Sequence, residues 1–363
     1  MNSKAFLINL EVLTYQKTFK QAPTNVDIAF IVTFVTKRRK IMFTNKDIEF
    51  RSVYVINCIT ERELRVSNGE LLLEEKQDKK VLTKLPFQKI LALIVVGHIH
   101  ITTPLIEKCK KFNVALIVLK ASLRPVFFWA DSAEGNFLVR KKQYEFDKED
   151  ISIARILVFN KIANGIELLK RTRKKDEKTQ TAIDGARFYL EQCRTAVKYN
   201  ELMGIEGSSA KLFFSAYFQD FNWTRRMPRT KCDYINSILD IGYTYLFNFI
   251  ECFVRMFGFD IYIGVYHRLW FKRKSLICDL MEPFRCIIDL TVRTSINRGQ
   301  FTLADFDLYK GEYRLKRDCN MKYSKVFFDA LVPHKMDIFK YVQTYYRAFM
   351  KSKSLDQYPR FCI

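Results

Sequence analysis

The chain lacks the cysteine spacing of a zinc module and of a disulfide framework. Its nine cysteines are an odd number, and no two of them stand in a C-x-x-C pair. Zinc modules need closely spaced ligands, and small secreted domains need cysteines that can pair. Cys58, Cys252 and Cys278 stand inside apolar runs, where a free cysteine acts as a small hydrophobic residue. We therefore expect a protein of a reducing cytoplasm.

Long hydrophobic runs are missing as well. The most apolar run near the N-terminus, Ile28 to Val35, contains Thr33 and is followed by a basic cluster at 37–40. A run of this length is too short to cross a bilayer, and no signal-peptide cleavage pattern follows it. We therefore expect a soluble protein.

Acidic residues are the minority charge. The chain has 61 Lys and Arg against 39 Asp and Glu, a net charge of +22. The excess is spread along the chain in clusters, with Trp223, Trp270 and Phe271 among them. Basic clusters interleaved with aromatic residues are typical of nucleic-acid binding, and an acidic membrane surface is the alternative. The clusters lie at 37–40, 170–178, 225–231, 272–274 and 314–317.

Histidine is scarce, and one of the four histidines lies between two acidic motifs. Glu206 stands in a Gly-Ile-Glu-Gly segment, His267 ends a Gly-Val-Tyr-His segment, and Asp279 and Glu282 follow in Asp-Leu-Met-Glu. On one helix, two residues three apart point from the same face. Carboxylates with one imidazole, and no thiolate nearby at ligand spacing, suit Mg²⁺ or Mn²⁺ better than zinc. Such an ion in a basic protein is typical of phosphodiester chemistry on nucleic acid.

Each of these residues also has an ordinary structural interpretation. A glutamate between glycines is usually a solvated turn residue, an isolated histidine is usually structural, and a D-x-x-E pair is common on exposed helices. The order, spacing and flanking residues of the three segments favour a functional interpretation, because together they resemble the motifs of a known family.

That family is CRISPR-associated protein one, the integrase subunit of CRISPR adaptation. Its G-x-E-G-x-x-A segment is similar to residues 204–210, and its glycine-to-histidine segment is similar to residues 264–267. Its S-L-x-x-D-L-M-E-x-F-R motif is matched by residues 275–285, and its D-x-x-N-x-x-L-x-x-G-Y-x-x-L helix by residues 233–246. The resemblance extends over residues 52–335.

The sequence departs from the family's usual pattern in two segments. The proline-rich stretch that family members carry before the long helix is reduced here to Pro228. The segment from Arg268 to Lys274, Arg-Leu-Trp-Phe-Lys-Arg-Lys, stands where they often have prolines and glycines. These departures affect the expected loop conformation and leave the expected ligands in place.

The resemblance implies an α+β fold, in which a mostly-β N-terminal domain is followed by an all-α catalytic domain. We expect an N-terminal extension of unclear role at 1–51, a β-rich dimerisation domain at 52–147, an α-helical metal-dependent catalytic domain at 148–345 and a C-terminal tail at 346–363. Two alternatives for the extension stay open. Ile28–Val35 and Ile41–Phe43 could add a hairpin, or Met42 could be the natural start.

Local patterns predict individual elements. Asn68-Gly69 predicts a two-residue hairpin turn, because both central residues of a type I′ turn need positive φ. Asp233 is expected to cap a long helix, and Pro283 to kink a helix or mark where it begins. Strands are expected at 53–59, 64–66, 70–73, 90–96, 114–119, 124–129 and 136–139. Helices are expected at 104–112, from 153, at 176–195, at 207–218 with Glu206 at or near its start, at 233–258 and at 275–293. A polar loop is expected at 305–320.

By resemblance, the protein is a divalent-metal-dependent DNA endonuclease and integrase of antiviral CRISPR adaptation in a prokaryotic cytoplasm. The 3′-hydroxyl of a foreign DNA fragment attacks a phosphodiester at the edge of a CRISPR repeat, and the fragment becomes a new spacer. The implied ligands of Mg²⁺ or Mn²⁺ are Glu206, His267 and Glu282, and Asp279 is an auxiliary catalytic carboxylate. The candidate DNA contacts are Lys211, Arg225, Arg226, Arg229, Arg273 and Arg285.

The resemblance also implies partners. They are double-stranded and branched DNA, a second copy of this chain, and a dimer of CRISPR-associated protein two. CRISPR-associated protein four is a further candidate, and no membrane is expected.

Two other functions stay open. One is a transposon-borne integrase with the same catalytic fold; such relatives tend to add a C-terminal DNA-binding module, for which little chain remains after His334. The other is a non-catalytic nucleic-acid-binding scaffold, against which the intact acidic and histidine set argues.

Overall fold

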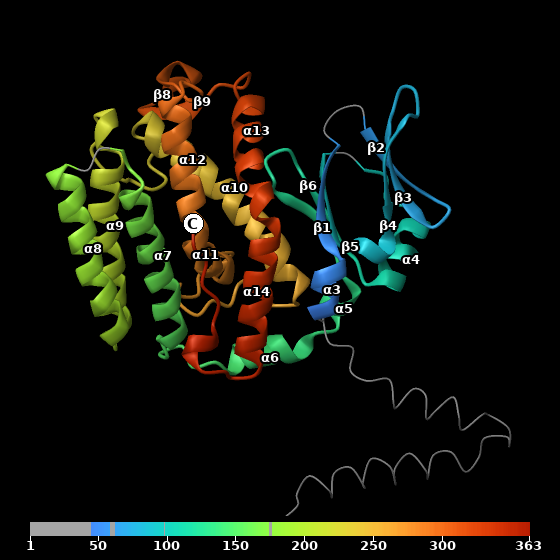
Figure 1. The fold of residues 1–363 in the computed structure, drawn as a ribbon, viewed down its shortest axis with the longest axis horizontal. Coiled ribbons are helices and arrows are strands. Elements are labelled where there is room, and N and C mark those ends of the chain that lie inside the picture. The colour runs from blue at the N-terminus through green and yellow to red at the C-terminus, as the bar shows by residue number, and fades with distance from the viewer. Residues whose placement is uncertain (1–44, 59–61, 98, 174–175) are drawn as a thin grey trace, which may run out of the picture. The chain divides into compact units, whose positions relative to one another are not determined.

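Residues 45–58, 62–97, 99–173 and 176–363 are described by the computed structural model, and Asn45–Ile363 form one unit. The possible strands at Ile28–Val35 and Ile41–Phe43 and the basic cluster at 37–40 lie outside the described residues. A short helix, α3 (Asn45–Phe50), leads into a strand-rich region, and a mostly helical region follows it (Figure 1). The fold class is therefore α+β, as the sequence predicts.

A four-stranded sheet of order β1-β5-β6-β7 forms the centre of the strand-rich region. Its strands are β1 (Ser52–Cys58), β5 (Ile90–Gly97), β6 (Ala115–Leu119) and β7 (Pro125–Trp129). The first three are parallel, and β7 is antiparallel to β6. Helix α4 (Thr103–Phe112) connects β5 to β6. Every residue of β5 from Ile90 to Val96 is buried, because both faces of the sheet are covered.

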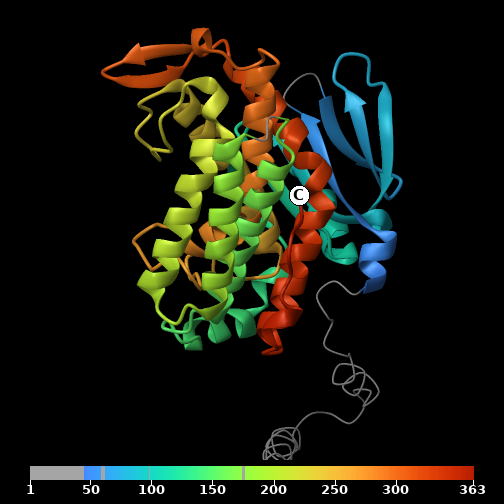
Figure 2. The same ribbon diagram turned by 60° about the vertical axis from the view of Figure 1, so that its left-hand side comes forward.

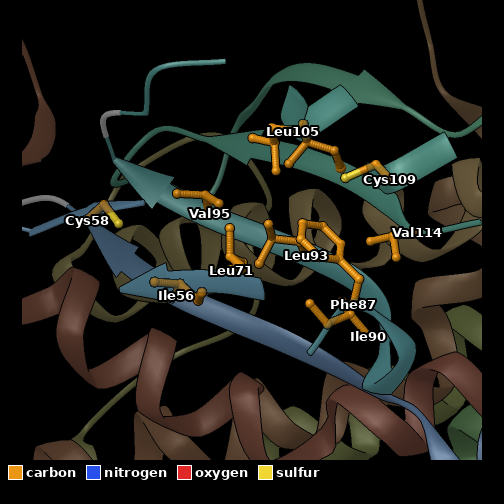
Figure 3. Packing of buried hydrophobic residues seen from close by; sticks show 11 residues of the cluster. Ile56, Cys58, Leu71, Phe87, Ile90, Leu93, Val95, Leu105, Cys109 and Val114 are labelled. Atoms are coloured by element: carbon orange, nitrogen blue, oxygen red, sulfur yellow. The ribbon is translucent and has the colours of Figure 1, made fainter. Parts of the chain in front are cut away.

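A second sheet and α4 cover one face of the first. It consists of β2 (Arg62–Ser67), β3 (Glu70–Glu75) and β4 (Val81–Pro86), all antiparallel. Asn68 and Gly69 join β2 to β3 with φ values of +48° and +81°, which confirms the predicted two-residue turn. Leu71 of β3, Leu93 of β5 and Phe87 before β5 point toward one another in the apolar cluster of Figure 3.

The helices of the second region pack on one another and on the first sheet. They are α5 (Asp131–Glu134), α6 (Phe137–Glu145), α7 (Ser152–Lys170), α8 (Glu177–Thr195), α9 (Tyr199–Tyr217), α10 (Tyr234–Met256), α11 (Ser275–Met281), α12 (Arg285–Asn297), α13 (Asn320–Leu331) and α14 (Lys335–Met350). Helices α7, α8 and α9 lie side by side (Figure 2). Helix α10 contacts β7, and α14 contacts β1, so these two helices cover the other face of the sheet. None of the described helices is long and apolar enough to cross a membrane.

The predicted boundaries of the long helices are supported by their caps. The Asp233 carboxylate accepts a hydrogen bond from the Asn236 N–H at 2.7 Å and caps α10 as predicted. Gly258 follows the end of α10 with a φ of +77°. A Cβ atom there would lie 2.6 Å from the carbonyl oxygen of Ala133, so only glycine permits this close approach.

The prediction of a strand at 136–139 is wrong, because these residues begin helix α6. The helix buries Val139 and Gln143, which are one turn apart on the same helix face. The Gln143 amide donates to the carbonyl oxygens of Asp260 and Ile263 at 2.9 and 3.0 Å. These contacts stabilise the turn after α10, and they come from residues far away in the sequence.

The predicted polar loop at 305–320 contains a hairpin of β8 (Phe306–Tyr309) and β9 (Glu312–Leu315). Lys310 and Gly311 form its turn with φ values of +51° and +78°. The Tyr313 N–H donates to the Lys231 carbonyl at 2.8 Å, so the hairpin is held by a loop from another part of the chain. The helical region is therefore not purely α-helical.

The residues after α14 pack against α7. The carbonyl oxygen of Phe361 accepts hydrogen bonds from the side-chain amides of Asn160 and Asn164 at 2.7 and 3.0 Å. The Phe361 ring is buried and lies 4.5 Å from the ring of Phe284, between centroids. This segment therefore supports the helix that contributes to the cavity described next.

Candidate functional site

The three motif segments meet at one cavity of about 900 Å³. Glu206 from α9, His267 from the loop after α10, and Glu282 at the end of α11 all line it. Lys161 from the middle of α7 lies among them. The structure therefore brings together the predicted residues Glu206, His267 and Glu282, which are separated by up to 76 positions in the sequence (282 − 206).

Asp279 lies behind His267 and is fully buried. Its carboxylate accepts hydrogen bonds from the backbone N–H groups of Val265, Tyr266 and His267 at 2.7, 3.1 and 2.9 Å. One of its oxygens lies 2.7 Å from Nδ1 of His267. A carboxylate on Nδ1 fixes the orientation of the ring and leaves Nε2 free for another ligand.

Gly264 makes this arrangement possible. A Cβ atom at this position would lie 2.5 Å from the Asp279 carboxylate, closer than any side chain could tolerate. The glycine of the Gly-Val-Tyr-His segment is therefore needed so that the Asp279 carboxylate can contact three successive backbone N–H groups. Its role is steric, because its φ is not in the positive range.

Glu206 is the eighth residue of α9, which begins at Tyr199, so the prediction that it stands at or near a helix start is wrong. Gly204 and Gly207 are helical here, because α9 gains its stability from packing against α7 and α8 rather than from local propensity. The Glu206 carboxylate is 18% exposed and accepts hydrogen bonds from Lys161 and from the Tyr266 hydroxyl.

Lys161 joins the two glutamates of the cavity. Its ammonium contacts an oxygen of Glu206, and it lies 2.7 Å from an oxygen of Glu282. Burial disfavours the charged ammonium, but the two carboxylates together hold the pKa of Lys161 above its ordinary value. The ammonium is therefore a cation placed between two acids.

Glu282 is nearly inaccessible to solvent, with 2% of its surface exposed. Arg285 donates at 2.8 Å to the same carboxylate oxygen that Lys161 contacts. Burial acts to raise the pKa of Glu282, but Arg285 and Lys161 outweigh burial and lower it to about 2. The carboxylate therefore stays ionised, although the free energy of transferring a charge out of water opposes this.

The spacing of Asp279 and Glu282 alone suggests that they share one helix face. In the structure they do not. Helix α11 ends at Met281, and a 3-10 turn, η3 (Glu282–Phe284), precedes α12. Pro283 therefore interrupts the helix as predicted. The break lets Asp279 contact the His267 loop, while Glu282 reaches Lys161 of α7.

A second buried group lies deeper in the cavity wall. The Tyr243 hydroxyl donates to Asp289 at 2.5 Å, and the guanidinium groups of Arg226 and Arg285 lie 5.4 and 4.5 Å from the centroid of its ring. Burial raises the pKa of Asp289 to about 6. Tyr243 thus joins α10 to α12.

The candidate DNA contacts divide into two groups. Arg226, Arg229 and Arg285 line the cavity, and Lys274 does so as well. Arg226 also pairs with Asp240 at 2.5 Å. Lys211 and Arg225 are exposed and Arg273 is half-buried, and these three lie outside the cavity lining.

The donor set fits a divalent ion in its chemistry. Two carboxylates and a free imidazole nitrogen, on Glu206, Glu282 and His267, are ligand types that Mg²⁺ and Mn²⁺ accept. The Lys161 ammonium shows that this position favours positive charge. Within the described residues, no group of three histidine, cysteine, aspartate or glutamate side chains is already at ligand spacing. Binding would therefore require the carboxylates to turn away from Lys161.

Sequence reasoning missed the role of Lys161. It noted the residue as part of a helix, but not as a member of the site. The available signal was its neighbours, because Asn160 and Asn164 are polar positions on a helix that is otherwise apolar on its buried side. Buried polar residues in such a helix usually have specific partners.

Comparison with known proteins places this geometry in a family. The model of the family described as CRISPR associated protein Cas1 matches residues 57–328. A CRISPR-associated endonuclease Cas1 of Thermus thermophilus is 27% identical over 284 residues, which cover 76% of this chain and 83% of the relative. Another, of Thermodesulfovibrio yellowstonii, is 26% identical and covers 81% of this chain and 96% of the relative. A Cas4/Cas1 fusion of Geobacter sulfurreducens is 28% identical over 76% of this chain and 53% of the fusion.

Solved structures share the fold. A chain of a partial Cas6-RT-Cas1–Cas2 complex superposes with a TM-score of 0.73 at 19% identity, over 85% of this chain and 99% of that one. A casposase bound to integration product superposes with a TM-score of 0.57 at 20% identity, over 84% and 92% of the two chains. Because the family model covers well over half of the residues and spans all three motif segments, the chain belongs to the CRISPR associated protein Cas1 family.

Proposed function

We propose that this chain is the endonuclease and integrase of CRISPR adaptation, which joins a foreign DNA fragment to a CRISPR repeat. The observation that carries the proposal is the meeting of Glu206, His267 and Glu282 at one cavity, in a chain of the Cas1 family. The relatives are named endonucleases, and the casposase of similar fold is described as bound to an integration product.

The reaction is a transesterification. The 3′-oxygen of the fragment forms a bond to a phosphorus of the repeat, and the bond from that phosphorus to the 3′-oxygen of the target strand breaks. The attacking hydroxyl loses a proton and the leaving oxygen gains one, so no external energy source is required. The positive side chains of Arg226, Arg229 and Lys274 at the cavity would bind the phosphates on either side.

We also propose that Glu206, Glu282 and Nε2 of His267 hold Mg²⁺ or Mn²⁺. Such an ion supplies positive charge at the reacting phosphate. Asp279 orients His267 through Nδ1, and this contact fixes which ring nitrogen faces the cavity. Binding of Mn²⁺ in the absence of DNA should raise the unfolding temperature of the wild-type protein, and Glu206→Ala should remove this shift.

The test of the function is strand transfer with purified protein. The substrates are a short duplex fragment and a plasmid that carries a CRISPR repeat, and a fragment with 3′-dideoxy ends is the chemical control. We expect Glu206→Ala and His267→Ala to abolish joining, while Glu191→Ala and His100→Ala, which change exposed residues, retain it. Joining by Glu206→Ala at the wild-type rate would overturn the proposal.

The same assay separates the alternatives. A transposon-borne integrase would join fragments to plasmids without a repeat as efficiently as to plasmids with one. A nucleic-acid scaffold would bind both DNAs and join neither. Preference for the repeat edge together with loss of joining in Glu206→Ala is expected only of an adaptation integrase.

The proposed partners are DNA, a second copy of this chain and a Cas2 dimer. Complete insertion needs both fragment ends joined, and this requires two sites held a fixed distance apart by a two-fold assembly. One similar structure is described as a complex with Cas2, and a relative is a fusion with Cas4, which makes Cas4 a further candidate. Light scattering should show a dimer, with the strand-rich domain at 52–147 as the expected interface. A monomer at all concentrations would contradict this.

A further inference from the structure

Lys161 places a cation where the proposed function requires a different one. Its ammonium contacts Glu206 and lies 2.7 Å from a carboxylate oxygen of Glu282. These two carboxylates are the proposed ligands of Mg²⁺ or Mn²⁺. An ammonium and a divalent ion repel each other, so they do not share one position between the same two acids. Ion binding therefore separates Lys161 from the carboxylates.

Each carboxylate has a second partner that holds it when Lys161 leaves. The Tyr266 hydroxyl donates to the oxygen of Glu206 that Lys161 does not contact, and Arg285 donates to Glu282 at 2.8 Å. The Tyr266 ring is itself buried and lies 5.7 Å from the Tyr199 ring, between centroids. The two glutamates are therefore oriented by groups other than Lys161.

Lys161 combines a fixed backbone with a flexible side chain. On either side of it, Asn160 and Asn164 bond to the Phe361 carbonyl oxygen, and these bonds hold this turn of α7. The lysine side chain is a flexible four-carbon stem. It lines the cavity, and 22% of it is exposed. The ammonium can therefore move within the cavity while the helix stays in place.

The charges at the site indicate where the displaced ammonium goes. In the structure, Glu206 and Glu282 are balanced by Lys161 and Arg285. Addition of a divalent ion leaves an excess of two positive charges. A phosphodiester under attack gains a second negative charge and would neutralise this excess. The reacting phosphate is thus a partner of matching charge for the ammonium.

We propose that Lys161 is a catalytic residue that exchanges partners. It competes with the ion for Glu206 and Glu282, and after its displacement it donates a hydrogen bond to a non-bridging oxygen of the reacting phosphate. This inference rests on the proposed function and adds a residue to its chemistry. No covalent bond to Lys161 forms, and the ammonium keeps its protons throughout.

The test is calorimetric titration of Mn²⁺ into the protein without DNA. Lys161→Met removes the competing charge and keeps most of the side-chain volume, so the Mn²⁺ affinity should rise roughly 10-fold or more. If Lys161 only holds the glutamates together, the two acids would repel each other in this variant and the affinity would fall. An unchanged or lower affinity in the folded variant would therefore overturn the proposal.

Three further variants sharpen the result. Lys161→Gln also removes the charge, but its amide still offers two donors to the glutamates, so it serves if Lys161→Met does not fold. Its Mn²⁺ affinity should rise as well. Lys161→Arg keeps the charge and should bind Mn²⁺ no more tightly than the wild-type protein. Lys170→Met, at an exposed position of the same helix, is the matched control and should leave the affinity unchanged.

The contact with the phosphate is tested by DNA binding with a fragment that has 3′-dideoxy ends, which prevents joining. Mn²⁺ should raise the DNA affinity of the wild-type protein, and this increase should be several-fold smaller in Lys161→Met. At saturating Mn²⁺, Lys161→Met should also join DNA about 10-fold or more slowly, because a charged hydrogen bond to the phosphate is lost. Tighter ion binding together with slower joining is not expected of a residue that only stabilises the fold. An equal increase in DNA affinity in both proteins would show that the ammonium does not reach the phosphate.

The outcomes separate this inference from the proposed function. If the wild-type protein joins DNA while Lys161→Met and Lys161→Gln bind Mn²⁺ no more tightly than it does, the exchange of partners is wrong and the proposed function stands. If the wild-type protein neither binds Mn²⁺ nor joins DNA, both are wrong.

Discussion

The strand-rich core and the site around the cavity both contain fully buried side chains, but these are stabilised in different ways. Leu93 and Phe87 in the first, and Asp279 in the second, have no exposed surface. The first group is surrounded by apolar side chains, and burial of apolar area stabilises it. The second is charged and is stabilised by specific partners, without which burial would be unfavourable. Low exposure alone therefore does not tell which substitutions a buried position tolerates.

The largest difference should appear at Glu282. Glu282→Ala removes the carboxylate partner of Arg285 and one of the two carboxylates at Lys161, and should lower the free energy of unfolding by about 3–5 kcal/mol. It should also reduce strand transfer by about a thousandfold, since it deletes a proposed ligand. Denaturant unfolding and the joining assay measure the two effects.

Glu282→Gln keeps the volume and should still lose joining, which separates the loss of charge from any loss of fold. Glu191→Ala, on the exposed side of α8, is the control. Full joining by Glu282→Ala would show that the wrong carboxylate has been assigned.

In the strand-rich core, Leu93→Ala should reduce stability and leave the chemistry intact. Removing a fully buried leucine costs about 2–5 kcal/mol, because it leaves a cavity in a packed cluster. The variant should join DNA at the wild-type rate at a temperature where it is folded. Leu138→Ala, at a half-exposed position of α6, should change neither property. A joining rate that falls in folded Leu93→Ala would break the distinction between the two regions.

Asp289 should make stability depend on pH in the cavity wall. Burial raises its pKa from 3.8 to about 6, so between these values the folded protein binds a proton that the unfolded chain has released. Stability from this group is present below pH 4 and is lost as the pH rises to 6, by at most about 3 kcal/mol. Asp289→Asn should reduce the slope of the free energy of unfolding against pH in this range. Asp184→Asn, at an exposed position, should leave that slope unchanged. If the pH dependence of the free energy of unfolding were the same in Asp289→Asn as in the wild-type protein, another group would be its cause.

The smallest expected effect is at Asp279, because it acts on the chemistry through His267. Asp279→Asn should lower the Mn²⁺ affinity and the joining rate by about 10–100-fold, as is typical of residues that orient a ligand. Calorimetric titration with Mn²⁺ measures the Mn²⁺ affinity in the absence of DNA. Asp307→Asn, exposed on β8, is the matched substitution. A loss as complete as that of Glu282→Ala would indicate that Asp279 contacts the ion itself.

The features that the sequence predicted well are those with local causes. The continuous apolar runs at β5 and β6, the Asn68-Gly69 turn and the Asp233 cap need only neighbouring residues to form. Helix α6 and the β8–β9 hairpin were mispredicted, because Gln143 and Tyr313 bond to partners more than 80 positions away. The approach of the three motifs was predictable by resemblance.

The ion pairing inside the site was not predictable. Lys161 is one of 61 basic residues, and only the packing of α7 against α9 and η3 shows that its ammonium lies between two glutamates. The α9 register was also missed, since glycines on either side of Glu206 suggest a helix start and not a helix interior.

The bonds from Asn160 and Asn164 to Phe361 have a consequence for the lifetime of the site. Residue 161 lies between these two anchors, so the turn of α7 that holds its ammonium is tied to a segment outside the cavity. In terms of hydrogen exchange, the amides of this turn and that of Phe361 belong to one cooperative unit and should open together. Each opening of the segment after α14 would then loosen the ion pairs of the cavity, without any residue of the cavity having changed.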